Sequence, residues 1–325
     1  MRLYVLTLFV VFMMTAQPVQ AAQVPAAASW SLTAVGDIML DRHVREQMKV
    51  KGNMYPFAKI APQLKGAEVV LGNLEGPITA NRSVATNNHL VFTFEPTVAP
   101  ILKRVGLTTL SLANNHTLNF GQSGLISTRA ALKKSGLEYF GDPKNRTGYH
   151  LTKTINHQQV VFLGYHGLVG GLDTVLLDVQ RAHQKGEYVM VMAHSGVEYS
   201  LMFTARQQQD YRRLIDAGAD LIIGAHPHVV EPLEVYHGKL IAYSLGNFIF
   251  DQYFSADTQQ GLLLNMIFSS STMTINIIPL LASNGQVAAA VGTVKTKLLE
   301  RLAKSSVVTS AVRDNIRAGS FIISR

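Results

Sequence analysis

Two histidines set one residue apart are the first candidates for chemistry in this sequence. They are His226 and His228, which flank Pro227 in the stretch GAHPHVVEP, residues 224–232. Residues two apart in an extended chain point the same way, and a proline favours the extended form in the residue before it, so both imidazoles are expected to reach one centre. Imidazole nitrogen binds divalent metals at about 2 Å, and the pair therefore predicts one wall of a metal site.

Four further stretches hold residues of the kinds that bind metal or transfer protons. They supply Asp37 in AVGDIMLD, Asn73 and Glu75 in GNLEGPIT, Asn114, Asn115, His116 and Asn119 in LANNHTLNFG, and His194 and Glu198 in MAHSGVEYS. Each alone has an ordinary structural explanation, because an aspartate after a strand is commonly a helix cap or a turn residue. Three amides around one histidine, however, are too polar for an apolar core without a compensating network. Together the five stretches predict a site.

The chain contains no cysteine, which excludes a disulfide framework, a thiolate zinc site and a cysteine nucleophile. Any metal must therefore be held by imidazole nitrogen and by carboxylate or amide oxygen. This donor set suits zinc, manganese or iron, and we expect one or two divalent ions as the cofactor.

Short apolar runs alternate with helical stretches, and this pattern predicts an α/β layered domain that positions the polar residues. The strand-like runs are SLTAVGD, AEVVLGN, LTTLSLANN, QQVVFLGY, EYVMVMAHS, DLIIGAH and KLIAYSLGN. Nearly every run ends in Asp, Asn, His or Gly, and sheets covered by helices bind ligands at the carboxyl ends of their strands. The intervening stretches EPTVAPILKRVG, GQSGLISTRAALKKSG and TARQQQDYRRLIDAG have helical apolar spacing.

The amino-terminal sequence MRLYVLTLFVVFMMTAQPVQAAQ has the build of a secretory signal peptide over residues 1–22. Arg2 precedes an apolar run, and small residues stand at Ala21 and Ala22. The run is shorter than the ~20 residues that a spanning helix needs. We therefore expect export to the periplasm or cell envelope, with an uncleaved amino-terminal membrane anchor as the alternative.

The pattern changes again toward the carboxyl terminus. From about Gly261 the chain reads as alternating segments such as GLLLNMIFSSSTMTINIIPL, which predict a hairpin followed by a mixed tail. Residues 255–325 are therefore expected to form a β-rich extension packed on the same domain as residues 31–254.

The charge of the chain argues against nucleic-acid binding. The 29 Lys and Arg exceed the 21 Asp and Glu by eight, but the excess is dispersed and forms no basic tract or helix face. Dispersed positive charge aids solubility, and it also favours a polyanionic surface polymer as a partner.

Six motifs in order resemble those of the CapA family of capsule biosynthesis proteins, also called poly-γ-glutamate synthesis proteins of the PgsA type. They are GDIML, NLEGP, ANNHTLNFG, HSGVEY, GAHPHVVEP and YSLGNFIFDQ, and the resemblance spans roughly residues 31–254. It implies the calcineurin-like metallophosphoesterase fold, a four-layer α/β/β/α sandwich in which two β-sheets lie face to face with helices outside.

The metallophosphoesterase pattern carries over residue by residue. It implies metal ligands at Asp37, Glu75, Asn115, His194, His226 and His228. Two departures stand out, because the histidine that normally follows the first aspartate is Met39, and the bridging aspartate is replaced by Asn73 with Glu75 as the nearest carboxylate. The chain also has Ser195 and Asn119 where the family usually has an aromatic residue and an aspartate. One metal is therefore expected to have lost a ligand.

The resemblance implies an exported metallophosphoesterase-like protein that acts in the synthesis, release or export of an anionic cell-surface polymer. A bound metal would lower the pKa of water to give hydroxide and would polarise the scissile group. His116 is the expected catalytic residue, which would protonate the leaving group or stabilise its charge. Substrate contacts are expected at Asn73, Asn114, Glu198 and Asn247. The alternative is a non-catalytic accessory protein whose pocket binds the polymer or its precursor, or a membrane-bound synthase.

Overall fold

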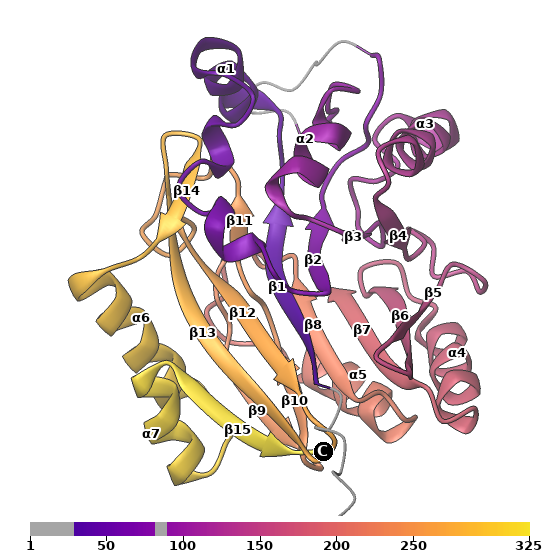
Figure 1. Ribbon diagram of the computed structural model, residues 1–325, viewed down its shortest axis with the longest axis vertical. Coiled ribbons are helices and arrows are strands. Elements are labelled where there is room, and N and C mark those ends of the chain that lie inside the picture. The colour runs from indigo at the N-terminus through magenta and orange to yellow at the C-terminus, as the bar shows by residue number, and fades with distance from the viewer. Residues whose placement is uncertain (1–28, 82–89) are drawn as a thin grey trace, which may run out of the picture.

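Two β-sheets lie face to face in the computed structural model of the chain, which describes residues 29–81 and 90–325 (Figure 1). The predicted signal peptide, residues 1–22, lies outside the described residues. Leu32 and Leu71 of the first sheet share one buried cluster with Phe162, Met190 and Ile223 of the second. The core between the sheets is therefore built from aliphatic and aromatic side chains of both.

The first sheet has nine strands in the order β14-β13-β12-β1-β2-β3-β4, with β11 paired to β1 and β15 paired to β13. Its strands are β1 (Trp30–Ile38), β2 (Val69–Leu74), β3 (Thr109–Ser111), β4 (Glu138–Phe140), β11 (Asn247–Ile249), β12 (Gln260–Phe268), β13 (Thr272–Ser283), β14 (Gln286–Ala289) and β15 (Ser320–Ser324). Strands β1 to β4 run parallel, so their carboxyl ends share one edge.

The second sheet has six strands in the order β5-β6-β7-β8-β10-β9. They are β5 (Leu151–Ile155), β6 (Gln158–His166), β7 (Tyr188–His194), β8 (Leu221–Ala225), β9 (Leu233–Tyr236) and β10 (Lys239–Ala242). Strands β6, β7, β8 and β10 are parallel. The carboxyl ends of β6, β7 and β8 therefore also meet at one edge.

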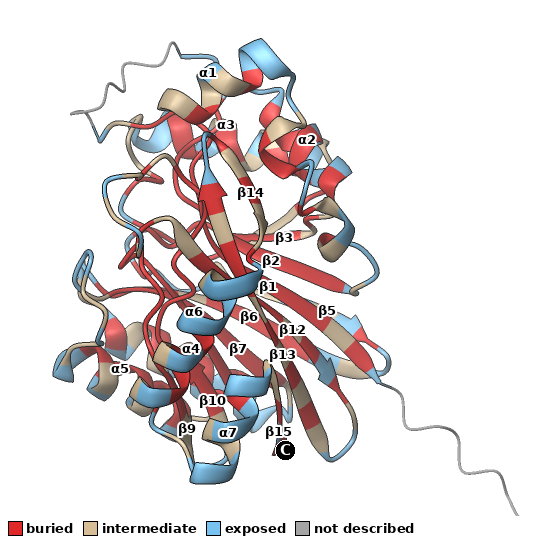
Figure 2. Cartoon of the chain, turned by 90° about the vertical axis from the view of Figure 1, so that its left-hand side faces the viewer, coloured by how far each residue is buried: buried red, intermediate tan, exposed pale blue. Residues whose placement is uncertain are grey.

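Helices cover the outer faces of both sheets. Helices α1 (Arg42–Lys51), α2 (Val98–Val105) and α3 (Gly121–Lys134), with the 3-10 turns η1 (Tyr55–Phe57) and η2 (Ala61–Leu64), pack on the first sheet. Helices α4 (Leu172–Gln184) and α5 (Ala205–Asp216) pack on the second. Figure 2 shows buried residues along the strands and exposed residues on the outer sides of the helices. The expected four-layer α/β/β/α sandwich is confirmed.

Local sequence explains where the helices begin and end. The three stretches with helical spacing form α2, α3 and α5. Helix α5 begins at a capping box between Thr204 and Gln207, and α2 ends at Gly106, whose φ of 114° favours glycine. Every helix among the described residues is too short or too polar to cross a membrane.

The segment after residue 254 contains helices as well as strands. Strands β12 and β13 form the predicted hairpin, and β12 pairs antiparallel with β1 from Trp30↔Phe268 to Val35↔Leu263. Helices α6 (Gly292–Ser305) and α7 (Ser310–Ala318) bury Leu302 and Ile316 in the core between the sheets. This segment therefore extends the first sheet and completes the core.

Candidate metal centre

The carboxyl ends of strands from both sheets converge on one buried centre. Asp37 of β1 stands in register with Asn73 of β2, and His194 ends β7 in register with Ala225 of β8. The Nδ2 of Asn73 donates to Asp37 Oδ1 at 2.8 Å and lies 3.1 Å from His194 Nδ1. One amide thus joins the two sheets at the point where the predicted ligands meet.

Asp37, Glu75 and His194 form a buried group able to hold a metal ion, with one ligand atom of each within 4.8 Å of the others. Glu75 follows β2 directly, and neither of its buried oxygens has a hydrogen-bond partner in the described part of the chain. A buried carboxylate without a partner is costly. A bound cation would remove this cost, so the donor set fits a divalent metal.

His228 lies beside this group. Its Nδ1 is 3.0 Å from Asn247 Oδ1 and 3.4 Å from Asp37 Oδ2, and its Nε2 is 3.7 Å from Glu75 Oε1. Asn247 Oδ1 accepts from Nδ1, so the lone pair of the His228 ring is on Nε2, which faces Glu75. His228 can therefore offer Nε2 to an ion held by Glu75.

Asn115, His194 and His226 form a second set of donors next to the first. Asn115 Oδ1 lies 2.9 Å from His194 Nε2, and the ring centroids of His194 and His226 are 4.8 Å apart. The buried Nδ1 of His226 has no hydrogen-bond partner among the described residues, while its backbone N–H donates to Asp37 Oδ2 at 3.2 Å. All six predicted ligands therefore lie in one centre, in two adjoining sets, and His194 lies beside members of both.

The carboxyl and imidazole groups of the centre have shifted pKa values. Burial and then the charge of Asp37 raise the pKa of Glu75 well above its usual range. Burial also raises the pKa of Asp37, but the hydrogen bond and charge of His228, together with hydrogen bonds from Asn73 and the His226 backbone, hold the value below its usual range. Burial lowers the pKa of His226 to about 4, with His228 adding to the effect, so the imidazole is neutral and able to donate a lone pair near pH 7.

The backbone around the histidine pair is not extended as predicted. His226 and His228 have φ values of 100° and 58°, in the region that favours glycine. The extended-chain argument was therefore wrong, because the loop after β8 turns sharply under the contacts of Asp37 and Asn247. Both rings still face the centre, and backbone strain of this kind persists where the surroundings determine the conformation.

Met39 supplies no ligand in place of the missing histidine. Its side chain is fully buried in the core beside the first sheet, and its sulfur accepts a hydrogen bond from the Asp41 backbone N–H at 3.1 Å. This arrangement is consistent with one metal position having one donor fewer.

His116, the predicted catalytic residue, reaches the centre from the loop after β3. Its Nε2 is 3.8 Å from Glu75 Oε1, and its Nδ1 is 3.1 Å from Asn119 Oδ1. The same oxygen accepts from the Phe92 backbone N–H at 2.7 Å, and Phe92 packs on the imidazole with ring centroids 4.4 Å apart. Asn119 therefore fixes the ring so that Nε2 faces inward. Burial lowers the pKa of His116 to about 4.

The amides predicted to bind substrate are engaged with protein groups. Asn73 accepts from Asn114 at 3.0 Å, and Asn114 Oδ1 accepts from the backbone N–H groups of His116 and Thr117. Asn247 donates to Gln252 Oε1 and to the Thr258 carbonyl. These contacts orient the ligands and their loops, and the predicted contacts with substrate stay predictions.

Glu198 differs from these amides because it is exposed. Its charge helps to raise the pKa values of Glu75, His116 and His226, so it lies beside the centre. A hollow of about 440 Å³ opens next to it, lined by Arg42, His43, Leu90, Tyr199, Asp251, Gln252, Tyr253 and Phe254. Tyr199 stacks near His228 with ring centroids 6.2 Å apart, and its hydroxyl accepts from Gln252 at 3.3 Å. The hollow therefore adjoins the centre through Tyr199, although none of the predicted ligands lines it.

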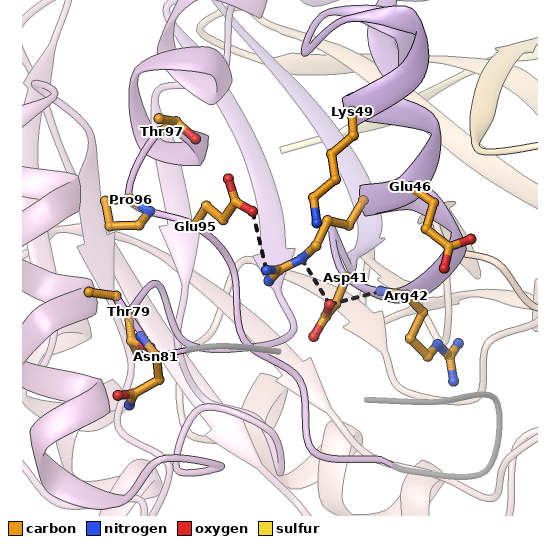
Figure 3. A pocket seen from close by; sticks show the side chains of 11 residues that line it. Asp41, Arg42, Glu46, Lys49, Thr79, Asn81, Glu95, Pro96 and Thr97 are labelled. Atoms are coloured by element: carbon orange, nitrogen blue, oxygen red, sulfur yellow. Dashed lines mark hydrogen bonds and ion pairs between the residues drawn. The ribbon is translucent and has the colours of Figure 1, made fainter. Parts of the chain in front are cut away.

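A second hollow, of about 590 Å³, lies beside α1 and is lined by none of the predicted ligands (Figure 3). Arg45 pairs with two of its acidic residues, since Arg45 Nε is 3.0 Å from Asp41 Oδ1 and Arg45 Nη1 is 3.4 Å from Glu95 Oε1. Its volume alone does not make it the reaction site.

The sequence-based prediction of the site did not include one buried histidine of the region, His166. It ends β6 in register with His194, and their ring centroids are 5.9 Å apart. The run QQVVFLGY stops one residue short of it. The signal that marked His194, a histidine at the end of an apolar strand, was available here as well.

The fold and this centre define the class: an α/β sandwich with carboxylate, amide and imidazole donors gathered at the carboxyl ends of its strands, as in calcineurin-like metal-binding proteins. The family profile described as "Bacterial capsule synthesis protein PGA_cap" matches residues 31–252. The chain belongs to this family and therefore has a role in bacterial capsule synthesis.

Individual proteins similar to this chain include two with capsule or PGA biosynthesis in their names. The chain is 33% identical over 280 residues to "Capsule biosynthesis protein CapA" of Bacillus anthracis, covering 78% of this chain and 68% of the relative. It is 31% identical over 274 residues to "PGA biosynthesis protein CapA" of Bacillus subtilis (strain 168), covering 77% and 71%. The crystal structure of the Thermus thermophilus protein TT1561 is similar at 12% identity with a TM-score of 0.44, covering 74% of this chain and 98% of that one.

Proposed function

We propose that this chain is an exported, metal-dependent hydrolase that acts on an anionic surface polymer or its precursor during capsule synthesis, release or export. The observation that supports it is the buried Glu75 carboxylate, which lacks hydrogen-bond partners among the described residues and faces Asp37, His194 and His228. Such a group is expensive in a structural core and useful in a metal site.

Asp37, Glu75 and His228 would hold one ion, and Asn115, His194 and His226 a second. The ion is zinc, manganese or iron, and when bound it supplies a water of lowered pKa and polarises the scissile group. Asn73 and Asn247 keep the ligands in place through their hydrogen bonds to Asp37 and His228.

His116 moves the proton. With Nδ1 fixed by Asn119, its Nε2 carries a lone pair that faces the centre. A neutral imidazole can accept a proton at Nε2 and return it to the leaving group, so that both charge and geometry suit acid–base work. The polymer would approach through the hollow beside Tyr199 and Gln252, past the exposed Glu198.

A test begins with protein purified without added metal. Elemental analysis of this protein, followed by assays with phosphodiesters, phosphomonoesters and γ-linked glutamate in the presence of zinc, manganese or iron, should find bound metal and turnover of one substrate class. The matched variant is His226→Ala combined with His228→Ala, which should lose the metal while circular dichroism shows an intact fold. Retention of metal by this double variant would contradict the assignment.

A second candidate is a non-catalytic accessory protein whose centre binds the polymer or a membrane-bound synthase. Met39 in place of a histidine ligand favours it. A Mycobacterium tuberculosis relative, 27% identical over 212 residues, is named "Probable polyglutamine synthesis accessory protein". Metal-loaded protein that binds polymer but hydrolyses none of the three substrate classes would favour this candidate.

A further inference from the structure

Three neighbouring strands of the second sheet each bring a histidine to their carboxyl ends. His166 ends β6, His194 ends β7 in register with it, and His226 follows β8 directly. Residues in register on adjacent parallel strands present their side chains on the same face of the sheet. The His194 ring contacts the rings of both His166 and His226.

Ring spacing is compatible with a shared ion. Two imidazoles on one metal with bonds of about 2.1 Å have ring centroids roughly 4.5–6.4 Å apart, depending on the bond angle. The centroids of His166 and His194 are 5.9 Å apart, and those of His194 and His226 are 4.8 Å apart. Both values fall within this range.

The tautomer of His166 is that of a metal ligand. Its Nδ1 lies 2.8 Å from the Pro143 carbonyl oxygen. A carbonyl oxygen only accepts, so Nδ1 carries the hydrogen and Nε2 carries the lone pair. Metal-binding histidines commonly donate their second nitrogen to a carbonyl in this way.

No hydrogen bond in the described part of the chain occupies the lone pair on His166 Nε2. His166 is 2% exposed, and its Nε2 is buried without a hydrogen-bond partner there. Meanwhile the backbone of His166 is held on both sides by Asn145, whose Oδ1 accepts from the His166 N–H and whose Nδ2 donates to the His166 carbonyl, each at 2.8 Å. The residue is thus fixed in position while one donor atom is left open.

We propose that His166 Nε2 is a further metal ligand, which joins Asn115, His194 and His226 around the second ion. The inference rests on the proposed metal centre and adds a donor that the family pattern did not supply. Three imidazoles with one amide oxygen form a site for zinc or iron rather than for magnesium or calcium.

Equilibrium dialysis of the full chain against zinc alone, with elemental analysis of bound metal, tests the proposal. His166→Asn keeps an amide donor near the position of Nδ1 and removes the Nε2 lone pair. The variant should bind the second zinc at least about 10-fold more weakly than the wild type, because even residues that only support a ligand contribute this much. His150 is exposed, so His150→Asn is the matched control, and its zinc binding should equal that of the wild type.

A second measurement does not depend on the folding of a variant. Anomalous scattering from crystals of the wild-type protein soaked in zinc should place an ion about 2.0–2.1 Å from His166 Nε2. Zinc bound in wild type at full stoichiometry, with unchanged affinity in His166→Asn or with no ion near Nε2, would overturn this inference and leave the proposed function standing. Wild-type protein that binds no zinc, manganese or iron would overturn both.

Discussion

His116 and His194 face the same centre but hold different partners, which separates their expected roles. His116 has only Glu75 among the predicted ligands within ion-pair distance, whereas His194 contacts Asn73, Asn115 and Asp37. His116→Ala should therefore keep its metal and lose turnover by roughly 10²–10⁴-fold, the usual contribution of an acid–base group. His194→Ala should lose both. The measurement is metal content beside turnover on the same samples, and loss of metal from His116→Ala would make it a ligand instead.

Glu75 determines how metal binding depends on pH. Because burial and Asp37 raise its pKa, the carboxyl holds its proton to higher pH than an ordinary glutamate, and a metal must displace that proton. Apparent metal affinity should therefore rise with pH until Glu75 is fully ionised in the metal-free protein. Calorimetric titration in buffers of different ionisation enthalpy should detect the released proton.

Glu75→Gln should bind metal more weakly and release no proton from this position. The exposed Glu68, which contacts Ser31 far from the metal ligands, provides the control variant Glu68→Gln. Equal proton release by wild type and Glu75→Gln would show that another group carries the proton.

Strand β1 places Asp37 only because the residue before it is glycine. A Cβ on Gly36 would lie 1.8 Å from the Gly246 carbonyl oxygen, the same oxygen that accepts from the Asp37 N–H at 3.1 Å. Gly36→Ala must push β1 away from the segment that leads into β11, and we expect a loss of roughly 3 kcal/mol or more in unfolding free energy. Urea unfolding measures it.

Gly136→Ala serves as the comparison. A Cβ there would meet only the Lys103 Cε within 4 Å, at 3.9 Å, so the main cost of the substitution is the strained φ of 68°. It should cost about 1–2 kcal/mol. A Gly36→Ala variant no less stable than Gly136→Ala would show that the two backbones can separate cheaply.

Helix α5 is tied to the histidine-bearing loops by a buried glutamate. Gln207 Nε2 donates to Glu231 Oε2 at 2.7 Å and to the Ser195 carbonyl at 3.3 Å. Burial raises the pKa of Glu231 to about 8, with the Gln207 hydrogen bond opposing the shift. A raised folded-state pKa favours the protonated folded state, so this contribution to stability is complete below the unfolded value and is lost as pH rises.

The expected window runs from pH about 4.5 to about 8, with a loss of at most about 1.4 kcal/mol per pH unit. Glu231→Gln should remove this loss, so that the difference in unfolding free energy between variant and wild type grows across the window. Denaturant unfolding at several pH values measures it. A constant difference would mean that Glu231 is ionised throughout.

At the scale of the whole molecule, the prediction of export depends on residues 1–22, which lie outside the described part of the chain. The proposed signal peptide occupies residues 1–22 and would leave a mature chain beginning near Ala22 or Gln23. Amino-terminal sequencing of protein recovered from the cell envelope should find that start. Full-length protein beginning at Met1 in the membrane fraction would instead indicate the uncleaved anchor.

The sequence alone was sufficient to predict that the candidate donors gather at strand ends, and to predict the elements that carry them. Asp37, His194 and His226 follow or end apolar runs, and helices α2, α3 and α5 follow from apolar spacing and capping residues, because such signals act over a few neighbouring residues. The β12–β13 hairpin was readable for the same reason.

Only the tertiary structure determined the contacts and orientations of these candidate donors. The contact between Asn73 and His194 joins residues 121 positions apart, and the orientation of His228 depends on Asn247 from another strand. The positive φ values of His226 and His228, the burial of Met39 and the open nitrogen of His166 likewise arise from long-range contacts. Periodicity and motif spacing report the local chain, whereas a tautomer, a strained turn or an unpartnered atom is determined by groups that the fold brings together from far along the sequence.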